Sequence, residues 1–272
     1  MLAHLEARDV IEAPLERLVN GKSEPVRSRF RLSYSSLLHL YGELGRARVF
    51  EAWDKSFDQY QSRKKSHKAR EAERRRQHVL VEAHLSLLAG LDYLRPERGL
   101  TARGEIARLL YGYELVITEL LFRGVLDDLP PKALAVVLVG LVHEERGRGP
   151  SEHVPRRLHG ATRARVDQVA EDILAAEHHH GIPTPSKTPS WGLTHAIDAW
   201  FDGQGFEAIE ELTPATPGEL CRTFRMALQL IRALARTLGD WREREPLRAR
   251  LEEAFERINR EEVDARRQLA LG

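Results

Sequence analysis

The sequence predicts a mostly α-helical protein. Helical periodicity dominates its 272 residues, and no segment alternates between apolar and polar residues for long, as a half-buried strand would. Pro130 and Pro131 stand where a helix opens, at its favoured first turn. A hydrophobic share of 42% is enough to bury a full core, in one large domain or two small ones. The expected fold class is therefore all-α, a mostly helical bundle.

Short helices are expected in the N-terminal part of the chain. Their ranges are 1–21, 25–45, 46–62 and 79–91. Ser33 or Ser35 is the expected N-cap of the second helix, because both hydroxyls stand just before its apolar run. The turn within residues 93–104 can form a small β-hairpin, as in a winged helix.

Longer helices are expected in the C-terminal part. One covers Thr101–Val125, with Gly124 near its end. The next, Lys132–His143, is apolar nearly all round, which places it in the centre of the core. Further segments with helical period cover 161–180, 193–202, 217–238 and 246–269.

Composition divides the chain into three parts. Residues 1–62 form an N-terminal helical segment, residues 63–78 a basic connector, and residues 79–272 a helical bundle. A softer boundary is expected at 181–190, where three prolines mark the clearest linker.

Charge and cysteine content limit the kinds of partner and of cellular compartment that we expect for the protein. With 42 basic and 41 acidic residues the net charge is +1, so only local clustering can indicate a polyanion partner. The single cysteine, Cys221, excludes an intrachain disulfide and fits a reducing compartment. The longest apolar run, Ala133–Val142, is about half as long as a membrane-spanning helix. We therefore expect a cytoplasmic protein without a membrane partner.

The segment 217–238 carries the sharpest local signal for nucleic-acid binding. At about 100° per residue, one side of this helix is a continuous apolar stripe. Within an arc of roughly 80° on another side lie the arginines Arg222, Arg225, Arg232 and Arg236. An arginine row fits the phosphates of a strand, and guanidinium planes can stack on unpaired bases. The alternative is a solvated helix face paired with neighbouring carboxylates.

A second positive cluster is the run RKKSHKAREAERRR at 63–76, with eight Lys and Arg residues against two Glu. Such a run can bind phosphates without regard to sequence, because each contact releases counterions. The candidate contacts in it are Lys64, Lys65, Arg74, Arg75 and Arg76. A solvated linker or an exposed helix explains the same run equally well. Arg103, in the hairpin-like turn, is a further candidate phosphate contact.

No pattern in the sequence indicates catalysis or metal binding. The three consecutive histidines at 178–180 point in different directions on a helix, so they cannot converge on one ion. The sequence Gly-Lys-Ser at 21–23 lacks the second glycine of a phosphate loop, because Glu16 holds that position. We therefore expect no catalytic residue, no metal ligand and no bound cofactor in this chain.

Four segments of the sequence, taken in order, resemble parts of a known protein family. They are SRFRLSYSSLLHL at 28–40, KSFDQYQ at 55–61, LTARGEIARLLYGYELVITELLFRGVLDDL at 100–129, and AIDAWFDGQGFEAI with TPGELCRTFRMALQLIRAL between 196 and 234. In this order they resemble the C-terminal part of superkiller-type, DExH-box (superfamily 2) RNA helicases. The first two resemble the region that follows the second motor lobe, and the others resemble the helical DSHCT domain. No long arch insertion separates them here, since residues 63–77 alone bridge that gap.

This resemblance implies an accessory domain that binds single-stranded RNA, or DNA, beside helicase motor lobes supplied in cis or in trans. Arg222 and Arg225 match positions on the family's ratchet helix, which lies along the exit path of the strand. ATP and magnesium would bind only to the motor lobes, because this chain lacks their motifs. The alternative function is a protein-interaction or regulatory module that keeps the helicase C-terminal fold without binding a strand.

Overall fold

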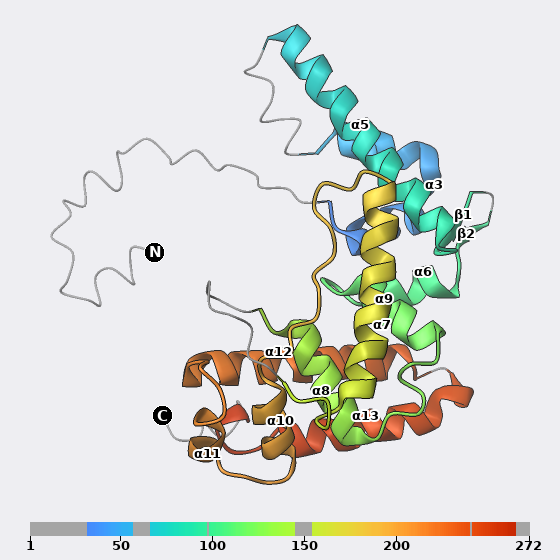
Figure 1. Ribbon diagram of the computed structural model, residues 1–272. Coiled ribbons are helices and arrows are strands. Elements are labelled where there is room, and N and C mark those ends of the chain that lie inside the picture. The colour runs from blue at the N-terminus through green and yellow to red at the C-terminus, as the bar shows by residue number, and fades with distance from the viewer. Residues whose placement is uncertain (1–31, 57–65, 97, 145–153, 240, 265–272) are drawn as a thin grey trace, which may run out of the picture.

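The computed structural model describes residues 32–56, 66–96, 98–144, 154–239 and 241–264. Within these ranges the chain forms ten α-helices, two short 3-10 helices and one two-stranded sheet (Figure 1). This architecture confirms the predicted all-α class with a small hairpin. The helix expected at 1–21 and the Gly-Lys-Ser turn lie outside the described residues.

The N-terminal part of the described chain contains α3 (Tyr34–Asp54) and α5 (His67–Gly90). Ser33 caps α3, and its hydroxyl accepts a hydrogen bond from the backbone of Ser36. Gly45 has a positive φ of 72° and divides α3 into two helical pieces, which confirms the boundary predicted there. The helix α5 runs without interruption through the boundary expected at 78–79, and its first half projects away from the other helices (Figure 1).

A short hairpin follows α5, as predicted. Strand β1 (Leu94–Arg95) pairs antiparallel with β2 (Gly99–Leu100). The chain then enters α6 (Ala102–Ala107), which Thr101 caps through a hydrogen bond from the Gly104 amide. A Cβ atom on Gly104 would lie 2.1 Å from the carbonyl oxygen of Tyr93, so this close approach requires glycine.

The prediction of one helix over Thr101–Val125 was wrong. The chain forms α6 and then α7 (Glu114–Phe122), separated by Gly112 in a positive-φ conformation (φ 89°). The apolar period continues across this break, because both helices contribute side chains to the same core. Periodicity alone therefore could not reveal the turn.

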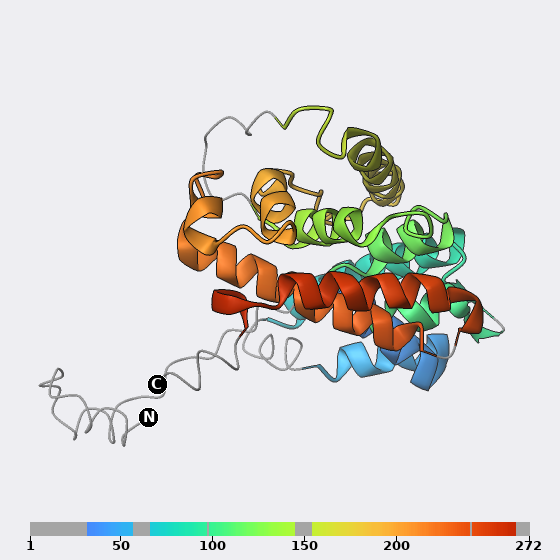
Figure 2. The same cartoon turned by 90° about the horizontal axis from the view of Figure 1, so that it is seen from below.

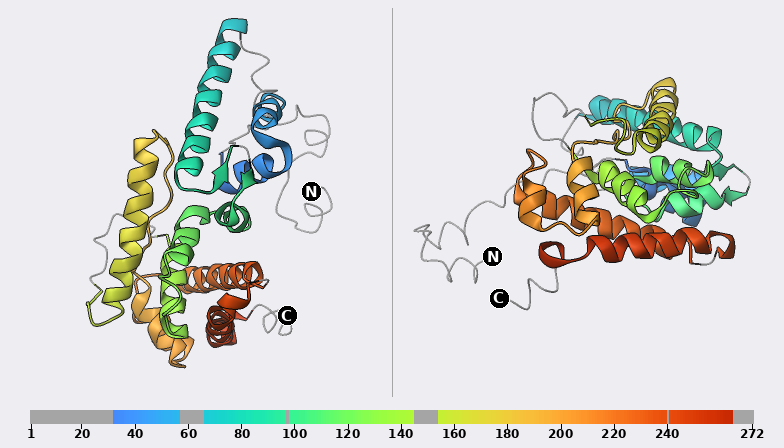
Figure 3. Two further views of the ribbon diagram at one scale, coloured as in Figure 1. Left: turned by 90° about the vertical axis from the view of Figure 1, so that its right-hand side faces the viewer. Right: turned by 60° about the horizontal axis from the view of Figure 1, so that its bottom comes forward.

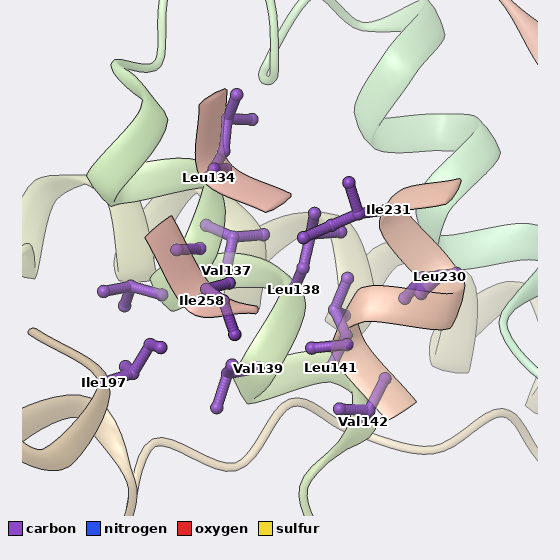
Figure 4. Close-up of a cluster of buried hydrophobic side chains, with 14 of the residues drawn as sticks. Leu134, Val137, Leu138, Val139, Leu141, Val142, Ile197, Leu230, Ile231 and Ile258 are labelled. Atoms are coloured by element: carbon purple, nitrogen blue, oxygen red, sulfur yellow. The ribbon is translucent and has the colours of Figure 1, made fainter. Parts of the chain in front are cut away.

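The bundle is built around α8 (Pro131–Val142), whose residues from Ala133 to Val142 are all buried. Around it lie α10 (Thr194–Phe201), α12 (Pro217–Thr237) and α13 (Glu245–Ile258). Figure 4 shows Leu138 and Leu141 of α8 close to Ile231 of α12. The predicted central position of the 132–143 helix is thus confirmed.

The remaining described elements complete the bundle. The helix α9 (Gly160–His179) packs on α7 and α8, and α11 (Phe206–Glu210) packs on α10. The 3-10 helices are η1 (Arg242–Arg244) and η2 (Glu261–Val263). Helices α12 and α13 pack against each other, and both pack against α8, which lies above them in Figure 2.

The last helix is shorter than the predicted 246–269. It ends at Ile258, because Asn259 leaves the helical region, and Glu261 at the start of η2 adopts a positive φ of 46°. The structure does not describe residues 265–272. No helix among the described residues has the length and apolarity that a membrane span needs.

Candidate nucleic-acid interface

The helix α12 has a strongly defined start. The Thr216 hydroxyl accepts from the Glu219 amide, and the Glu219 carboxylate accepts from the Thr216 amide at 3.0 Å. Pro217 occupies the first turn, where a missing N–H costs nothing. This reciprocal cap fixes the direction in which the helix leaves the preceding loop.

The apolar stripe predicted for α12 is confirmed. Its seven members all have exposed fractions of 5% or less, and they are Leu220, Phe224, Ala227, Leu228, Ile231, Leu234 and Leu238. They belong to the same core cluster as the aliphatic residues of α8 and α13. This burial fixes the rotation of α12 about its axis and so decides where its arginines lie.

Two of the four arginines contact other parts of the chain. Arg225 donates from Nε to the Val263 carbonyl at 3.0 Å and from Nη2 to the Glu262 carbonyl at 2.9 Å. The Arg232 guanidinium lies 4.4 Å from the centre of the Phe255 ring, a cation–π contact with α13. Both side chains therefore help to hold the C-terminal segment of the described chain against α12.

Arg236 and Arg222, which are both exposed, make fewer contacts with the rest of the chain. The Nε atom of Arg236 donates to the Arg232 carbonyl, one turn back in the same helix, at 3.2 Å. Arg222 makes no hydrogen bond or ion pair with any residue that the structure describes. It lies near Tyr113, where burial and Glu144 raise the pKa of the phenol and the Arg222 charge opposes that rise.

A cleft of about 750 Å³ opens along α12 on the side toward α3 and α5. Four segments line it together with Trp53: residues 32–34, residues 109–114, residues 183–187, and α5 through Gln77, Leu80 and His84. The fifth wall is α12, through Met226, Gln229, Leu230 and Ala233. In the left view of Figure 3, α3 and α5 lie above α12 and α13.

Helix geometry relates the arginine row to this cleft. At 100° per residue, Arg222 lies about 30° from the mean direction of the four α12 residues that line the cleft. Arg236 lies about 70° from it, Arg225 about 90° and Arg232 about 110°. The four arginines therefore do not all face the cleft. Arg222 is the one whose direction from the helix axis is closest to that of the cleft-lining residues.

The other predicted contacts are spread over the molecule. Arg103 forms an ion pair with the buried Glu119 and lies 4.8 Å from the centre of the Phe122 ring. On the exposed half of α5, Arg74 pairs with Asp54 at 3.0 Å, and Arg75 and Arg76 pair with glutamates of their own helix at 2.6 Å. Lys64 and Lys65 lie outside the described residues.

Two exposed side chains that line the cleft were not predicted from the sequence. Leu109 is 53% exposed and Tyr111 is 74% exposed, in the turn between α6 and α7. The signal that could have found them is Gly112, since an isolated glycine within an apolar helical pattern lowers the expectation that one helix continues through it.

Buried titratable groups lie beneath the cleft. Burial raises the pKa of the Glu114 carboxyl, although the Ser35 amide donates to it at 3.1 Å. Tyr34 donates from its hydroxyl to Glu177 at 2.7 Å, and burial together with that carboxylate raises the pKa of the phenol. Burial lowers the pKa of His84, which favours a neutral ring. Among the described residues, no group of three or more His, Cys, Asp or Glu side chains is placed to hold a metal ion.

Comparison with known proteins assigns the family. Residues 97–265 match the model of the DSHCT (NUC185) domain. ATP-dependent RNA helicase mtr4 of Schizosaccharomyces pombe is 26% identical over 167 residues, which is 57% of this chain and 14% of that protein. Human Superkiller complex protein 2 is 26% identical over 60% of this chain and 14% of its own length. DExH-box ATP-dependent RNA helicase DExH9 of Arabidopsis thaliana is 26% identical over 68% of this chain and 19% of its own length.

These relatives are much longer than the region that aligns, since the match spans at most 19% of their length in these three proteins. The family model, in contrast, covers strand β2 of the hairpin, the cleft-lining turn between α6 and α7, and the whole bundle. The chain belongs to the DSHCT domain family of superkiller-type RNA helicases.

Proposed function

We propose that this chain is an accessory single-stranded RNA-binding domain of a superkiller-type, ATP-dependent RNA helicase that acts in RNA processing or decay. Membership in the DSHCT family and the alignment with proteins named as RNA helicases support this proposal. The motor lobes would act in cis or in trans, and they would bind the ATP and magnesium. DNA remains the alternative strand.

One observation carries the proposal: Arg222 is exposed, lies on the face of α12 that turns toward the cleft and near the cleft-lining Tyr113, and has no carboxylate partner among the described residues. An arginine already paired would have to give up its partner before it could bind a phosphate. Arg222 has no such cost, and its planar group can bind a phosphate oxygen pair or stack on a base. Arg236 would extend the contact along α12, whereas Arg225 and Arg232 would act mainly by holding α12 in place.

The proposed mechanism is passive. The helical bundle forms one wall of a channel, and its arginines hold the strand while the motor lobes step along it. The exposed basic half of α5, with Arg74, Arg75 and Arg76, and the neighbouring Lys64 and Lys65 would add affinity that does not depend on sequence. Arg103 would contribute least, because its partner Glu119 is buried and would be left without a counter-charge, whereas the ion pairs of α5 are more exposed.

Fluorescence anisotropy with a labelled single-stranded RNA at two salt concentrations tests this proposal. We expect binding at low salt and a loss of about tenfold in affinity for Arg222→Glu, with a salt dependence reduced by about one phosphate contact. The matched control is Arg157→Glu, which makes the same charge change at an exposed arginine outside the cleft. Absence of binding at low salt, or equal losses in both variants, would count against the proposal.

The second candidate function is a protein-interaction module that keeps the fold without binding a strand. The intramolecular contacts of Arg225 and Arg232 favour it, because they remove two members of the arginine row. This candidate predicts that a partner protein co-purifies with the chain and that a column of immobilised chain retains no RNA.

A further inference from the structure

We propose that the cleft beside α12 receives the nucleobases of the strand, with Tyr111 as a stacking surface, while Arg222 holds the phosphates outside. This inference rests on the proposed function and specifies which part of the nucleic acid enters the site. It differs from a phosphate-binding groove, in which the sugar–phosphate chain would lie along the floor.

The charge distribution of the cleft favours bases over phosphates inside it. The lining on α12 and α5 carries no charged side chain and includes the apolar Met226, Leu230 and Leu80. The one carboxyl in the lining, Glu114, would repel a phosphate when ionised. Unpaired positive charge lies outside the lining: Arg222, on the face of α12 that turns toward the cleft, has no ion-pair partner among the described residues, whereas Lys187 in the lining pairs with Glu144. A flat, uncharged base fits the interior, and an anion fits the edge.

The turn between α6 and α7 presents apolar surface to the solvent at this position. Tyr111 is 74% exposed and Leu109 is 53% exposed, two of the most exposed large apolar side chains among the described residues. Every nucleobase has an aromatic face, so an exposed tyrosine ring can stack on it whatever the sequence. An arginine beside an aromatic ring is the usual combination in proteins that bind single strands.

His84 supplies a second, independent observation. Its side chain is 4% exposed and lines the cleft. Its Nδ1 lies 2.8 Å from the Leu80 carbonyl oxygen, and because a carbonyl can only accept, Nδ1 carries the proton. In the neutral ring that burial favours, Nε2 is then an acceptor. No described residue donates to it. A base N–H or amino group is a donor of the required kind.

The volume of the cleft agrees with this occupant. Sites for small organic ligands measure roughly 300–1,000 Å³ and combine apolar walls with a few polar groups. The cleft measures about 750 Å³ and has this composition, with Gln77 and Gln229 as further hydrogen-bonding side chains. Both amides can donate and accept, so they suit several bases without selecting one.

The experiment compares a uniform single-stranded RNA with the same sugar–phosphate chain lacking its central bases. Wild-type protein should bind the abasic chain about tenfold more weakly, since its phosphates remain but stacking is lost. Tyr111→Ala should lose about tenfold on the normal RNA and almost nothing on the abasic chain. Tyr111→Phe should retain wild-type affinity, because the ring and not the hydroxyl makes the contact. Val79→Ala, an exposed apolar residue outside the cleft, is the matched control and should change neither affinity.

The outcomes separate this inference from the proposed function. Equal binding of normal and abasic chains would overturn the base-binding role of the cleft and leave strand binding intact, as would wild-type affinity of Tyr111→Ala. Binding of neither chain at low salt would overturn both. Since Tyr111 is mostly exposed, its truncation should not disturb the fold, and an unchanged thermal unfolding midpoint will verify this.

Discussion

The described residues contain two hydrophobic clusters of different character. The first, which we call the bundle core, joins the buried aliphatic residues of α8, α10, α12 and α13. The second, the hairpin core, joins α3, α5 and β1 to parts of α7 and α9. Beside the hairpin core lie buried polar groups, among them His84, Glu114 and Glu177, whereas the centre of the bundle core is formed by Leu, Val and Ile side chains (Figure 4). The cleft opens where the two clusters meet.

This difference shows which part of the fold supplies stability and which part shapes the site. Apolar burial is non-directional, so the bundle core holds the helices together without fixing any single polar contact. A buried carboxylate needs specific donors instead. Glu177 accepts from the Tyr34 hydroxyl at 2.7 Å and from the amide and hydroxyl of Ser186 at 2.8 Å each. These contacts join α3, α9 and the 183–187 wall of the cleft.

Truncation in the bundle core should have the largest effect on stability. Leu138→Ala removes a fully buried side chain of α8 and leaves a cavity, so we expect a loss of roughly 2–5 kcal/mol in the free energy of unfolding. Urea denaturation measures it. The RNA affinity of the folded fraction should stay unchanged, because Leu138 does not line the cleft. A large loss of affinity in the folded protein would show that the two regions are not separable.

Replacing the buried carboxylate of Glu177 should lower stability less than Leu138→Ala does, and it should lower RNA affinity more. In Glu177→Gln the amide nitrogen cannot accept from Ser186, so one donor loses its partner and unfolding should become easier by about 1–3 kcal/mol. Because Ser186 lies in the wall of the cleft, RNA affinity should also fall. Glu171→Gln, on the exposed side of the same helix, is the matched control. A stability loss without any change in affinity would contradict the assigned role of this contact.

The same contrast explains which parts of the fold and of the site could be predicted from the sequence. The helical periodicity of apolar residues predicted α8 and α12, and the position of a serine before an apolar run predicted the Ser33 cap. Both features depend on residues close together in the sequence, because an apolar stripe and a hydrogen bond to a free backbone amide at a helix start are local. The turn at Gly112 was missed, since the apolar pattern continues through it. The cleft combines side chains from five separate segments, and no local pattern encodes their approach. The partners of Arg225 lie 37 and 38 residues away, so its contacts could not be foreseen either.

Two arginines of α12 allow a further comparison with a smaller expected effect on stability. Arg225 contacts the C-terminal segment of the described chain, and Arg222 does not. Arg225→Ala removes two charge-assisted hydrogen bonds to the carbonyls of residues 262 and 263, so we expect a loss of about 1 kcal/mol in stability. Arg222→Ala should leave stability within about 0.5 kcal/mol of wild type, since it is an exposed residue without such contacts among the described residues. Denaturation of the two variants side by side measures this difference. Equal stability losses would show that the proposed division of the row is wrong.

The smallest expected effect concerns the pH dependence of stability. Burial raises the pKa of the Glu114 carboxyl in the folded protein above its unfolded value, so the folded state holds the proton more tightly. The contribution of this group to stability is therefore fully present below the unfolded pKa and is lost as the pH rises through the folded value. Glu114→Gln keeps an oxygen that can accept from the Ser35 amide but cannot ionise. The stability of wild type relative to this variant should accordingly fall between pH 4.5 and pH 7.5, by about 1 kcal/mol or less. Urea denaturation of both proteins across this pH range measures the change, and a relative stability that rises with pH would mean that the backbone donors around Glu114 outweigh its burial.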